Sequence, residues 1–116
     1  MGILDRYLLK RDNILRKKIE IDNTLYEEIV ELSKIYDASA NKIINIAILG
    51  LIESENVKLY KKPDNEISVS HSLLIREGFY KKLEEFREKY GISIYRLVNI
   101  AIKNVIDEEK EKNVKE

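Results

Sequence analysis

The chain carries one sequence pattern written twice, 54 residues apart. The tetrapeptide Asn-Ile-Ala-Ile occupies positions 45–48 and again positions 99–102. Other residues keep their character at the same offset: Ser39 and Ser93, Lys42 and Arg96, Tyr36 and Tyr90, Ile52 and Ile106, Glu55 and Glu109. Two copies of one unit predict two similar structural units, related by an approximate two-fold axis within a single chain.

The length of the chain limits how the two copies can fold. Each copy is about forty residues long and would be marginal alone, so the 116 residues are expected to form one domain whose core both copies share. The pattern divides the chain into an N-terminal arm at 1–14, a first repeat at 15–55, a linker at 56–66, a second repeat at 67–109 and a charged tail at 110–116.

The segments outside the repeats have distinct characters. The linker holds the only proline, Pro63, and can span roughly 35 Å when extended, which is enough to lead from one repeat to the next. The arm contains Ile3, Leu4, Tyr7 and Leu8 at helical spacing. We expect it to cap the core, with DNA contact and oligomerisation as the alternatives. The charged tail is expected to fray into solvent.

Each repeat opens with a segment in which apolar and polar residues alternate. In the first repeat Ile19 and Ile21 alternate with Lys18 and Glu20, and in the second the same period runs through residues 67–75. A period of two predicts a β-strand with one apolar face. Because a lone strand leaves its backbone groups unpaired, the two strands are expected to pair with each other as an antiparallel ribbon.

After each strand the apolar period becomes that of a helix. The helical stripes comprise Leu25, Ile29, Leu32 and Tyr36 in the first copy, and Phe79, Leu83, Phe86 and Tyr90 in the second. Gly91 is suited to end the later of these helices. A second helix follows in each repeat, and its first copy is apolar nearly all round, which predicts a position at the centre of the core. Its repeated asparagines, Asn45 and Asn99, are expected to satisfy backbone groups or each other rather than to do chemistry.

Composition argues against several classes of function. There is no cysteine, and the single histidine, His71, falls on the inward face of a strand. No nucleophile–base pair, ligand cluster or phosphate loop is visible, so we expect no enzyme, no catalytic residue, no metal, no cofactor and no small-molecule ligand. No apolar run is long enough for a signal peptide or a membrane span. This predicts a cytoplasmic protein without a membrane partner, in the host cytoplasm if the gene belongs to a mobile element or virus.

The charges of the chain balance. Its 21 Lys and Arg residues equal its 21 Asp and Glu residues in number, whereas a nucleic-acid binder usually has an excess of positive charge. The distribution is uneven, because the run Arg16-Lys17-Lys18 lies near the start and residues 107–116 hold five acids against three lysines. A basic end and an acidic end are therefore expected.

The order strand, helix, short turn, helix, with strands that pair across a two-fold axis, resembles the ribbon-helix-helix family of Arc/MetJ/CopG-like DNA-binding regulators. Each half of the chain is similar to one protomer of that family. The resemblance implies a mostly α fold made of two fused ribbon-helix-helix units that share one core, with a two-stranded antiparallel ribbon and four main helices. It covers most of the chain, from about residue 15 to 55 and from about residue 69 to 109.

In this family the ribbon enters the DNA major groove and its outward side chains contact base edges. Carried over by position, the outward residues are Arg16, Lys18, Glu20, Ser70, Ser72 and Leu74. Arginine and lysine can donate to guanine, serine can donate or accept, glutamate can accept from cytosine, and leucine can contact a thymine methyl group. Two positions depart from the family pattern: Glu20 would lie near phosphate, and Leu74 stands where the family usually has a polar residue. These departures leave open a poorer reading by one strand or a register shifted by one residue.

The family also binds DNA phosphates at the N-terminus of the second helix, where backbone N–H groups and the helix dipole favour an anion. The matching residues are Ser39, Ala40, Asn41, Lys42, Ser93, Ile94, Tyr95 and Arg96. A simple helix cap followed by a solvated cation is the alternative, but capping does not explain a basic residue at the same place in both repeats.

The resemblance implies a sequence-specific, double-stranded DNA-binding transcriptional regulator, more narrowly a repressor. Because the outward residues of the two strands differ, we expect an asymmetric DNA site. Weak affinity from balanced charge would favour self-association of several copies on DNA. The alternatives are a protein-interaction module, such as an antitoxin-like scaffold, and a plasmid partition or relaxosome accessory protein that also binds DNA.

Overall fold

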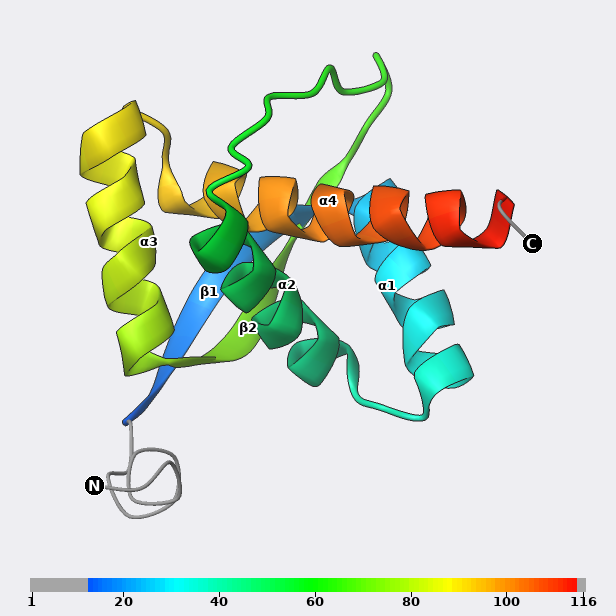
Figure 1. Cartoon of the computed structure of the whole chain (residues 1–116), viewed down its shortest axis with the longest axis horizontal. Coiled ribbons are helices and arrows are strands. Elements are labelled where there is room, and N and C mark those ends of the chain that lie inside the picture. The colour runs from blue at the N-terminus through cyan, green and yellow to red at the C-terminus, as the bar shows by residue number, and fades with distance from the viewer. Residues whose placement is uncertain (1–12, 115–116) are drawn as a thin grey trace.

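The computed structural model describes residues 13–114 of the chain. Most of the expected arm and the last two residues of the tail therefore lie outside the described residues. The elements follow in the order β1 (Ile14–Asp22), α1 (Asn23–Tyr36), α2 (Ala40–Ser54), β2 (Ser68–Arg76), α3 (Glu77–Tyr90) and α4 (Ile94–Val114). The prediction of a mostly helical protein with one two-stranded antiparallel sheet and four helices is confirmed. In Figure 1, α2 and α4 cross in front of the ribbon, with α3 and α1 on either side.

The two strands are nine residues long and pair along their whole length, from Ile14 opposite Arg76 to Asp22 opposite Ser68. The pair at the middle of the ladder is Lys18 and Ser72, which are 54 residues apart (72 − 18). The centre of the ribbon therefore coincides with the offset of the sequence repeat. The odd-numbered positions from Ile19 and Leu73 onward toward each following helix are buried.

The first helices of the two repeats begin with equivalent hydrogen bonds and end at residues with the same backbone conformation. The N–H of Asn23 donates to the carbonyl of Ile67 at 2.8 Å, and the N–H of Glu77 donates to the carbonyl of Asn13 at 2.8 Å. At the far ends α1 and α3 both stop at a residue in the left-handed conformation, Asp37 with φ 51° and Gly91 with φ 67°. Gly91 thus ends its helix as predicted, and Asp37 adopts the same backbone conformation without a glycine.

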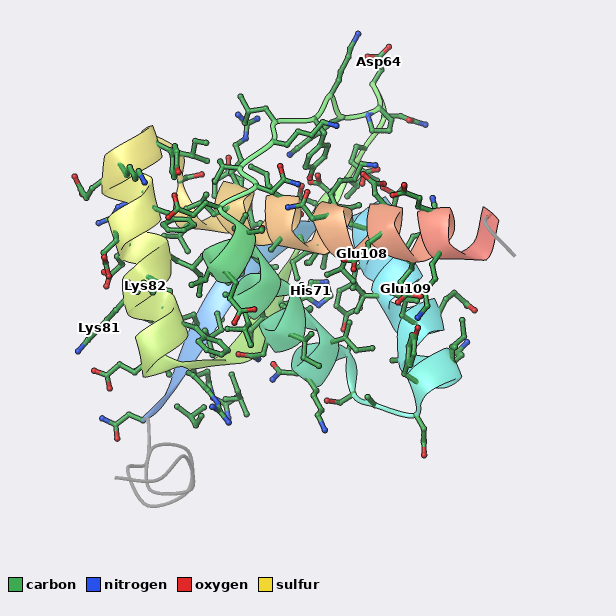
Figure 2. The ribbon with its side chains drawn as sticks, viewed as in Figure 1. Asp64, His71, Lys81, Lys82, Glu108 and Glu109 are labelled. Carbon is green, nitrogen blue, oxygen red and sulfur yellow. The ribbon has the colours of Figure 1, made fainter. Side chains whose placement is uncertain are left out.

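The tail beyond the second repeat continues α4. This helix runs for 21 residues to Val114, although fraying was expected beyond the repeat. Two contacts hold its last turns on α1: Tyr36 Oη donates to the carboxylate of Glu109 at 2.8 Å, and Lys110 Nζ lies 3.3 Å from Glu28 Oε1. Glu109 projects from α4 toward α1 in Figure 2. The charged residues therefore have partners on the fold, which sequence periodicity did not indicate.

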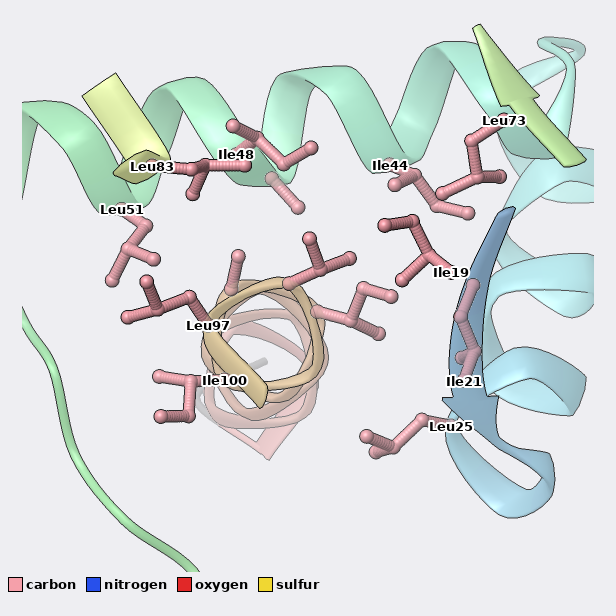
Figure 3. Packing of buried hydrophobic residues seen from close by; sticks show 14 of the residues in the cluster. Ile19, Ile21, Leu25, Ile44, Ile48, Leu51, Leu73, Leu83, Leu97 and Ile100 are labelled. Atoms are coloured by element: carbon pink, nitrogen blue, oxygen red, sulfur yellow. The ribbon is translucent and has the colours of Figure 1, made fainter. Parts of the chain in front are cut away.

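One cluster of buried apolar side chains draws residues from all six elements (Figure 3). The cluster is densest on α4, where residues 97–102 are all buried. The expectation that α2 lies in the core is confirmed on one side of the helix, where Ile43, Ile44, Ala47, Ile48 and Leu51 are buried. The expectation that it has no exposed side is wrong, because Ile46 is 55% exposed. In residues 97–102 it is α4 that has no exposed side, whereas α2 buries only one side of its surface.

No single helix among residues 13–114 is long and apolar enough to cross a membrane. The helices α1 and α2 satisfy those criteria only when taken together, across a bend of 108°.

Candidate nucleic-acid interface

The outer face of the ribbon gathers the six side chains expected to read DNA bases. They form three cross-strand pairs: Arg16 with Leu74, Lys18 with Ser72, and Glu20 with Ser70. All six are exposed. Side chains alternate between the two faces of a strand, and directly opposite residues share a face. The predicted set is therefore one contiguous surface, centred on Lys18 and Ser72.

The charge on this face is concentrated in β1. Within the described part of the chain Arg16 and Lys18 form no ion pair, so both cations are free to meet an anionic partner. Glu20 supplies the one opposing charge among the three pairs. At the end of the ladder Arg76 is exposed opposite Ile14 and adds a third cation to the same face. Sequence analysis missed Arg76 because the apolar alternation stops one residue earlier, at Ile75.

The first turn of α2 lies against the outer edge of β2. The side chain of Asn41 pairs with the backbone of Leu74: its Oδ1 accepts the N–H of Leu74 at 2.9 Å and its Nδ2 donates to the carbonyl of Leu74 at 3.1 Å. Asn45 Nδ2 donates to the same carbonyl at 2.7 Å. These bonds satisfy an edge strand that has no further strand beside it. They also fix the N-terminus of α2 next to the ribbon.

The first turns of α4 lie against the outer edge of β1 in the corresponding way. Asn99 Nδ2 donates to the carbonyl of Glu20 at 2.8 Å, and Asn99 Oδ1 accepts the N–H of Asp22 at 2.9 Å. The expectation that the repeated asparagines satisfy backbone groups is confirmed, and in each case the strand belongs to the other repeat. The two second-helix N-termini therefore flank the ribbon, one on each edge.

The eight residues expected to bind phosphate do not have equal surroundings. Ser39 caps α2 by accepting the N–H of Lys42 at 3.1 Å, and Lys42 is exposed. Ala40 and Asn41 are half-buried, with Asn41 held by β2 as described above. At the start of α4, Ser93, Tyr95 and Arg96 are exposed, but the side chain of Ile94 is buried in the core, so Ile94 can offer a ligand only its backbone. The exposed cations Lys42 and Arg96 occupy equivalent places at the two edges.

The linker packs beside the N-terminus of α4 and has no such counterpart beside α2 among the described residues. Its Leu59, Tyr60 and Lys62 line a small cavity together with Tyr95 and Arg96. The two edges of the ribbon are therefore chemically different, even where the helices match.

Asp22 is a buried carboxylate that anchors the linker, a role that sequence analysis did not predict. It is 2% exposed; Tyr60 Oη donates to it at 2.6 Å, Ser68 Oγ at 2.8 Å, and Lys62 Nζ lies 3.1 Å away. Burial would raise the pKa of Asp22, but these three partners outweigh burial and lower the pKa below the ordinary value of 3.8. Burial and the Asp22 carboxylate also raise the pKa of Tyr60. The site is structural, since every group in it is already paired.

His71 lies on the side of the ribbon that carries the helices (Figure 2). Its ring stacks on Tyr26 of α1 with centroids 3.8 Å apart, and its Nε2 has no hydrogen-bond partner among the described residues. Burial lowers the pKa of His71 below 6.5, so the ring is neutral near pH 7. Its stacking against Tyr26 assigns it a packing role.

Among the described residues no three His, Asp or Glu side chains lie together in a way that could hold a metal ion. Comparisons of the chain with protein-family models, curated proteins and solved structures find no match. The function therefore has to be inferred from the ribbon and its surroundings.

Proposed function

We propose that this chain is a sequence-specific double-stranded DNA-binding regulator of the ribbon-helix-helix type, which inserts its ribbon into the major groove and acts without catalysis in the cytoplasm. The observation that carries the proposal is the exposed outer face of the ribbon. It presents Arg16 and Lys18 without intramolecular ion pairs among the described residues, beside residues that can donate to or accept from base edges. A two-stranded ribbon has the dimensions that the major groove admits.

The same proposal treats the chain as two fused units around one core. Two hydrogen-bond pairs support this arrangement. Tyr36 Oη donates to Glu109 at 2.8 Å, and Tyr90 Oη donates to Glu55 at 2.6 Å. The offset of 54 converts one pair into the other, and each pair joins the first helix of one repeat to the end of the second helix of the other repeat. Reciprocal contacts of this kind are what a two-fold arrangement requires.

Phosphate binding completes the proposed interface. The exposed Lys42 and Arg96, with the backbone of Ser39, Ala40, Ser93 and Ile94, lie at helix N-termini that flank the ribbon. A helix N-terminus favours an anion, and phosphates of the two DNA strands border the major groove. Contacts on both edges would orient the ribbon while its outer side chains read the bases.

The proposal is tested by binding to DNA fragments from the neighbourhood of the gene, titrated at several salt concentrations. The informative variant is Arg16→Ala with Lys18→Ala. A good base contact is worth about 1–3 kcal/mol, so this double variant should lose roughly tenfold or more in affinity for the preferred fragment. The wild-type affinity should fall with salt along a straight log–log line, because bound phosphates release counterions.

The matched control removes two lysines elsewhere. Lys81 and Lys82 are exposed on α3 and project from its outer side (Figure 2), so Lys81→Ala with Lys82→Ala makes the same change in net charge. This control should keep near wild-type affinity. Equal losses in both double variants, or absence of wild-type binding at low salt with the fold intact, would reject the ribbon as a DNA reader.

A protein-interaction scaffold is the second candidate, and one observation favours it. A groove of about 460 Å³ opens beside α2, and the exposed Ile46 and partly buried Leu49 and Phe79 are among the residues that line it. An exposed apolar groove is typical of a surface that binds another segment of polypeptide. Partition and relaxosome roles would use the proposed DNA interface and differ only in the biological setting, as would self-association of several copies on DNA.

A further inference from the structure

Two isoleucines at equivalent places in the repeats have opposite exposure. Ile46 on α2 is 55% exposed, whereas Ile100 on α4, 54 residues later, is fully buried. Both belong to the repeated Asn-Ile-Ala-Ile motif, and both follow an asparagine that is bonded to the ribbon. The local sequence therefore does not explain the difference. Some other part of the chain covers Ile100 and leaves Ile46 open.

The covering segment in the second repeat is the linker. Leu59, Tyr60 and Lys62 line a cavity with Ile100, and the space that remains there is only about 10 Å³. Val57 and Tyr60 of the linker pack against the buried core. The linker is held in this place by the bonds from Tyr60 and Lys62 to Asp22.

The equivalent place in the first repeat is the groove beside α2. Four residues that line the linker cavity correspond, by the offset of 54, to four that line the groove: Tyr95 to Asn41, Arg96 to Lys42, Asn99 to Asn45, and Ile100 to Ile46. The described residues leave about 460 Å³ open there. The linker thus fills the position beside α4, whereas the described residues leave the equivalent position beside α2 as an open groove.

In the sequence, residues 1–12 precede β1 as the linker precedes β2. Residues 1–12 correspond to residues 55–66 by the same offset. Both segments end in the same contact, since the carbonyls of Asn13 and Ile67 accept the first N–H of α3 and α1, respectively. The next residue after Asn13 is Ile14, which lines the groove itself. The arm is therefore connected to the described chain at the edge of the groove.

We propose that residues 1–12 bind in this groove and cover Ile46, as the linker covers Ile100. The arm contains Ile3, Leu4, Tyr7 and Leu8. Transfer of such apolar side chains from water to an apolar surface lowers the free energy. The occupant is the arm of the same chain. This inference concerns the fold of the free protein and does not rest on DNA binding.

A spin label on the arm tests the position directly. The chain has no cysteine, so Asp5→Cys provides one attachment site without removing an apolar residue of the arm. Ile46 and Ile100 then serve as a matched pair of isotope-labelled methyl reporters. The label should broaden the Ile46 signal several-fold more than the Ile100 signal, and a control label at the exposed Lys112→Cys on α4 should not.

A mixing experiment distinguishes the two possible occupants of the groove, the arm of the same chain and the arm of a second copy. When spin-labelled protein without isotope is mixed with isotope-labelled protein without spin label, Ile46 should remain sharp. Broadening only in the mixture would mean that a second copy fills the groove, which overturns the proposal. Equal effects at Ile46 and Ile100, or none at either, would also overturn it.

Proteolysis provides a second readout. Trypsin can cut the arm after Arg6, Lys10 and Arg11. Ile46→Asp should release the arm and speed this cleavage on the order of tenfold, since an apolar contact of an isoleucine is lost. Ile35→Asp makes the same change at a 70% exposed position of α1 and should leave the rate unchanged. Equal cleavage rates in the two variants would contradict docking of the arm at Ile46.

Discussion

Asn99 holds the edge of the opposite repeat's strand, because its Nδ2 donates to the carbonyl of Glu20 at 2.8 Å. Its Oδ1 accepts the N–H of Asp22, so one buried side chain satisfies two backbone groups of β1. The equivalent Asn45 shares the carbonyl of Leu74 with Asn41, and its own Oδ1 is buried without a partner among the described residues. The same residue type therefore carries different weight in the two repeats.

This difference predicts unequal stability effects. Asn99→Leu leaves two backbone groups of β1 unpaired at about 1–3 kcal/mol each, so the free energy of unfolding should fall by about 2–6 kcal/mol. Asn45→Leu leaves the carbonyl of Leu74 bonded to Asn41 and removes an unpaired oxygen, so it should cost about 1 kcal/mol or less. Urea unfolding of both variants measures the difference. Equal losses would mean that the cross-repeat bonds do not set the stability of the ribbon.

Asp22 predicts a dependence of stability on acid. Its pKa is lowered in the folded protein, so it stabilises the fold above its ordinary value of 3.8 and loses that contribution as the pH falls through its folded pKa. Asp22→Asn should reduce the free energy of unfolding by about 2 kcal/mol at pH 7, because the amide can accept from only one of the Tyr60 and Ser68 hydroxyl groups and carries no charge to attract Lys62. The gap between wild type and variant should close below pH 4.

Lys62→Met is the matched control for Asp22. The lysine side chain is 36% exposed, whereas that of Asp22 is 2% exposed, so solvent screens much of the ion pair. This variant should cost less than Asp22→Asn, since the two hydroxyl groups still pair with the carboxylate. A larger effect of Lys62→Met would assign the anchoring of the linker to the ion pair instead of the hydrogen bonds.

The ribbon was largely predictable from the sequence because two simple periods agree. Alternation sorts Arg16, Lys18 and Glu20 to one face, and two equivalent strands related by a two-fold axis are expected to pair antiparallel. Both inferences depend only on local geometry and symmetry. The outward set follows from them, whereas the centring of the ladder on Lys18 and Ser72 comes from the structure, because the offset of 54 holds for every pair of equivalent residues.

The remaining features depend on where the segments outside the repeats pack. Asp22 occupies the N-cap position of α1, but its side chain makes no capping hydrogen bond and instead accepts one from Tyr60 of the linker. The exposure of Ile46 follows from the linker covering one repeat only. The last turns of α4 are ordered by partners on α1 such as Glu28. Neither local periodicity nor the repeat reports on these contacts, because they break the symmetry that the repeat implies.

His71 predicts a measurable shift in titration. Burial lowers its pKa, and it is the only histidine in the chain, so one imidazole resonance reports it. The midpoint of the proton NMR titration should lie below 6.5 in the folded protein and return to an ordinary value in urea. Tyr26→Leu removes the ring stacked on His71 and should raise the midpoint toward 6.5.

The same shift sets the sign of a stability change. Because the unfolded chain binds the proton more readily than the folded chain, the His71 contribution is complete above pH 6.5 and is lost as the pH falls toward the folded pKa. His71→Gln should remove this part of the pH dependence of the melting temperature. A folded midpoint at or above 6.5 would contradict the assignment of His71 to a desolvated site.

The two strands carry different residues on the outer face of the ribbon, which predicts an asymmetric DNA site, given the proposed function. The repeat offset relates Arg16 to Ser70, Lys18 to Ser72, and Glu20 to Leu74. Every related pair differs in chemistry, so the two halves of a bound site would meet different donors and acceptors. Selection from a random DNA pool should yield a sequence without two-fold symmetry.

Exchange of side chains turns this expectation into a matched experiment. Ser70→Arg, Ser72→Lys and Leu74→Glu in one variant would give both strands the outer face of β1, and the selected DNA should become an inverted repeat. The reverse variant, Arg16→Ser, Lys18→Ser and Glu20→Leu, should also select an inverted repeat, with weaker binding because two cations are lost. If wild type itself selects an inverted repeat, or if neither exchange alters the selected sequence, then side chains on the outer face of the ribbon do not determine which bases are read.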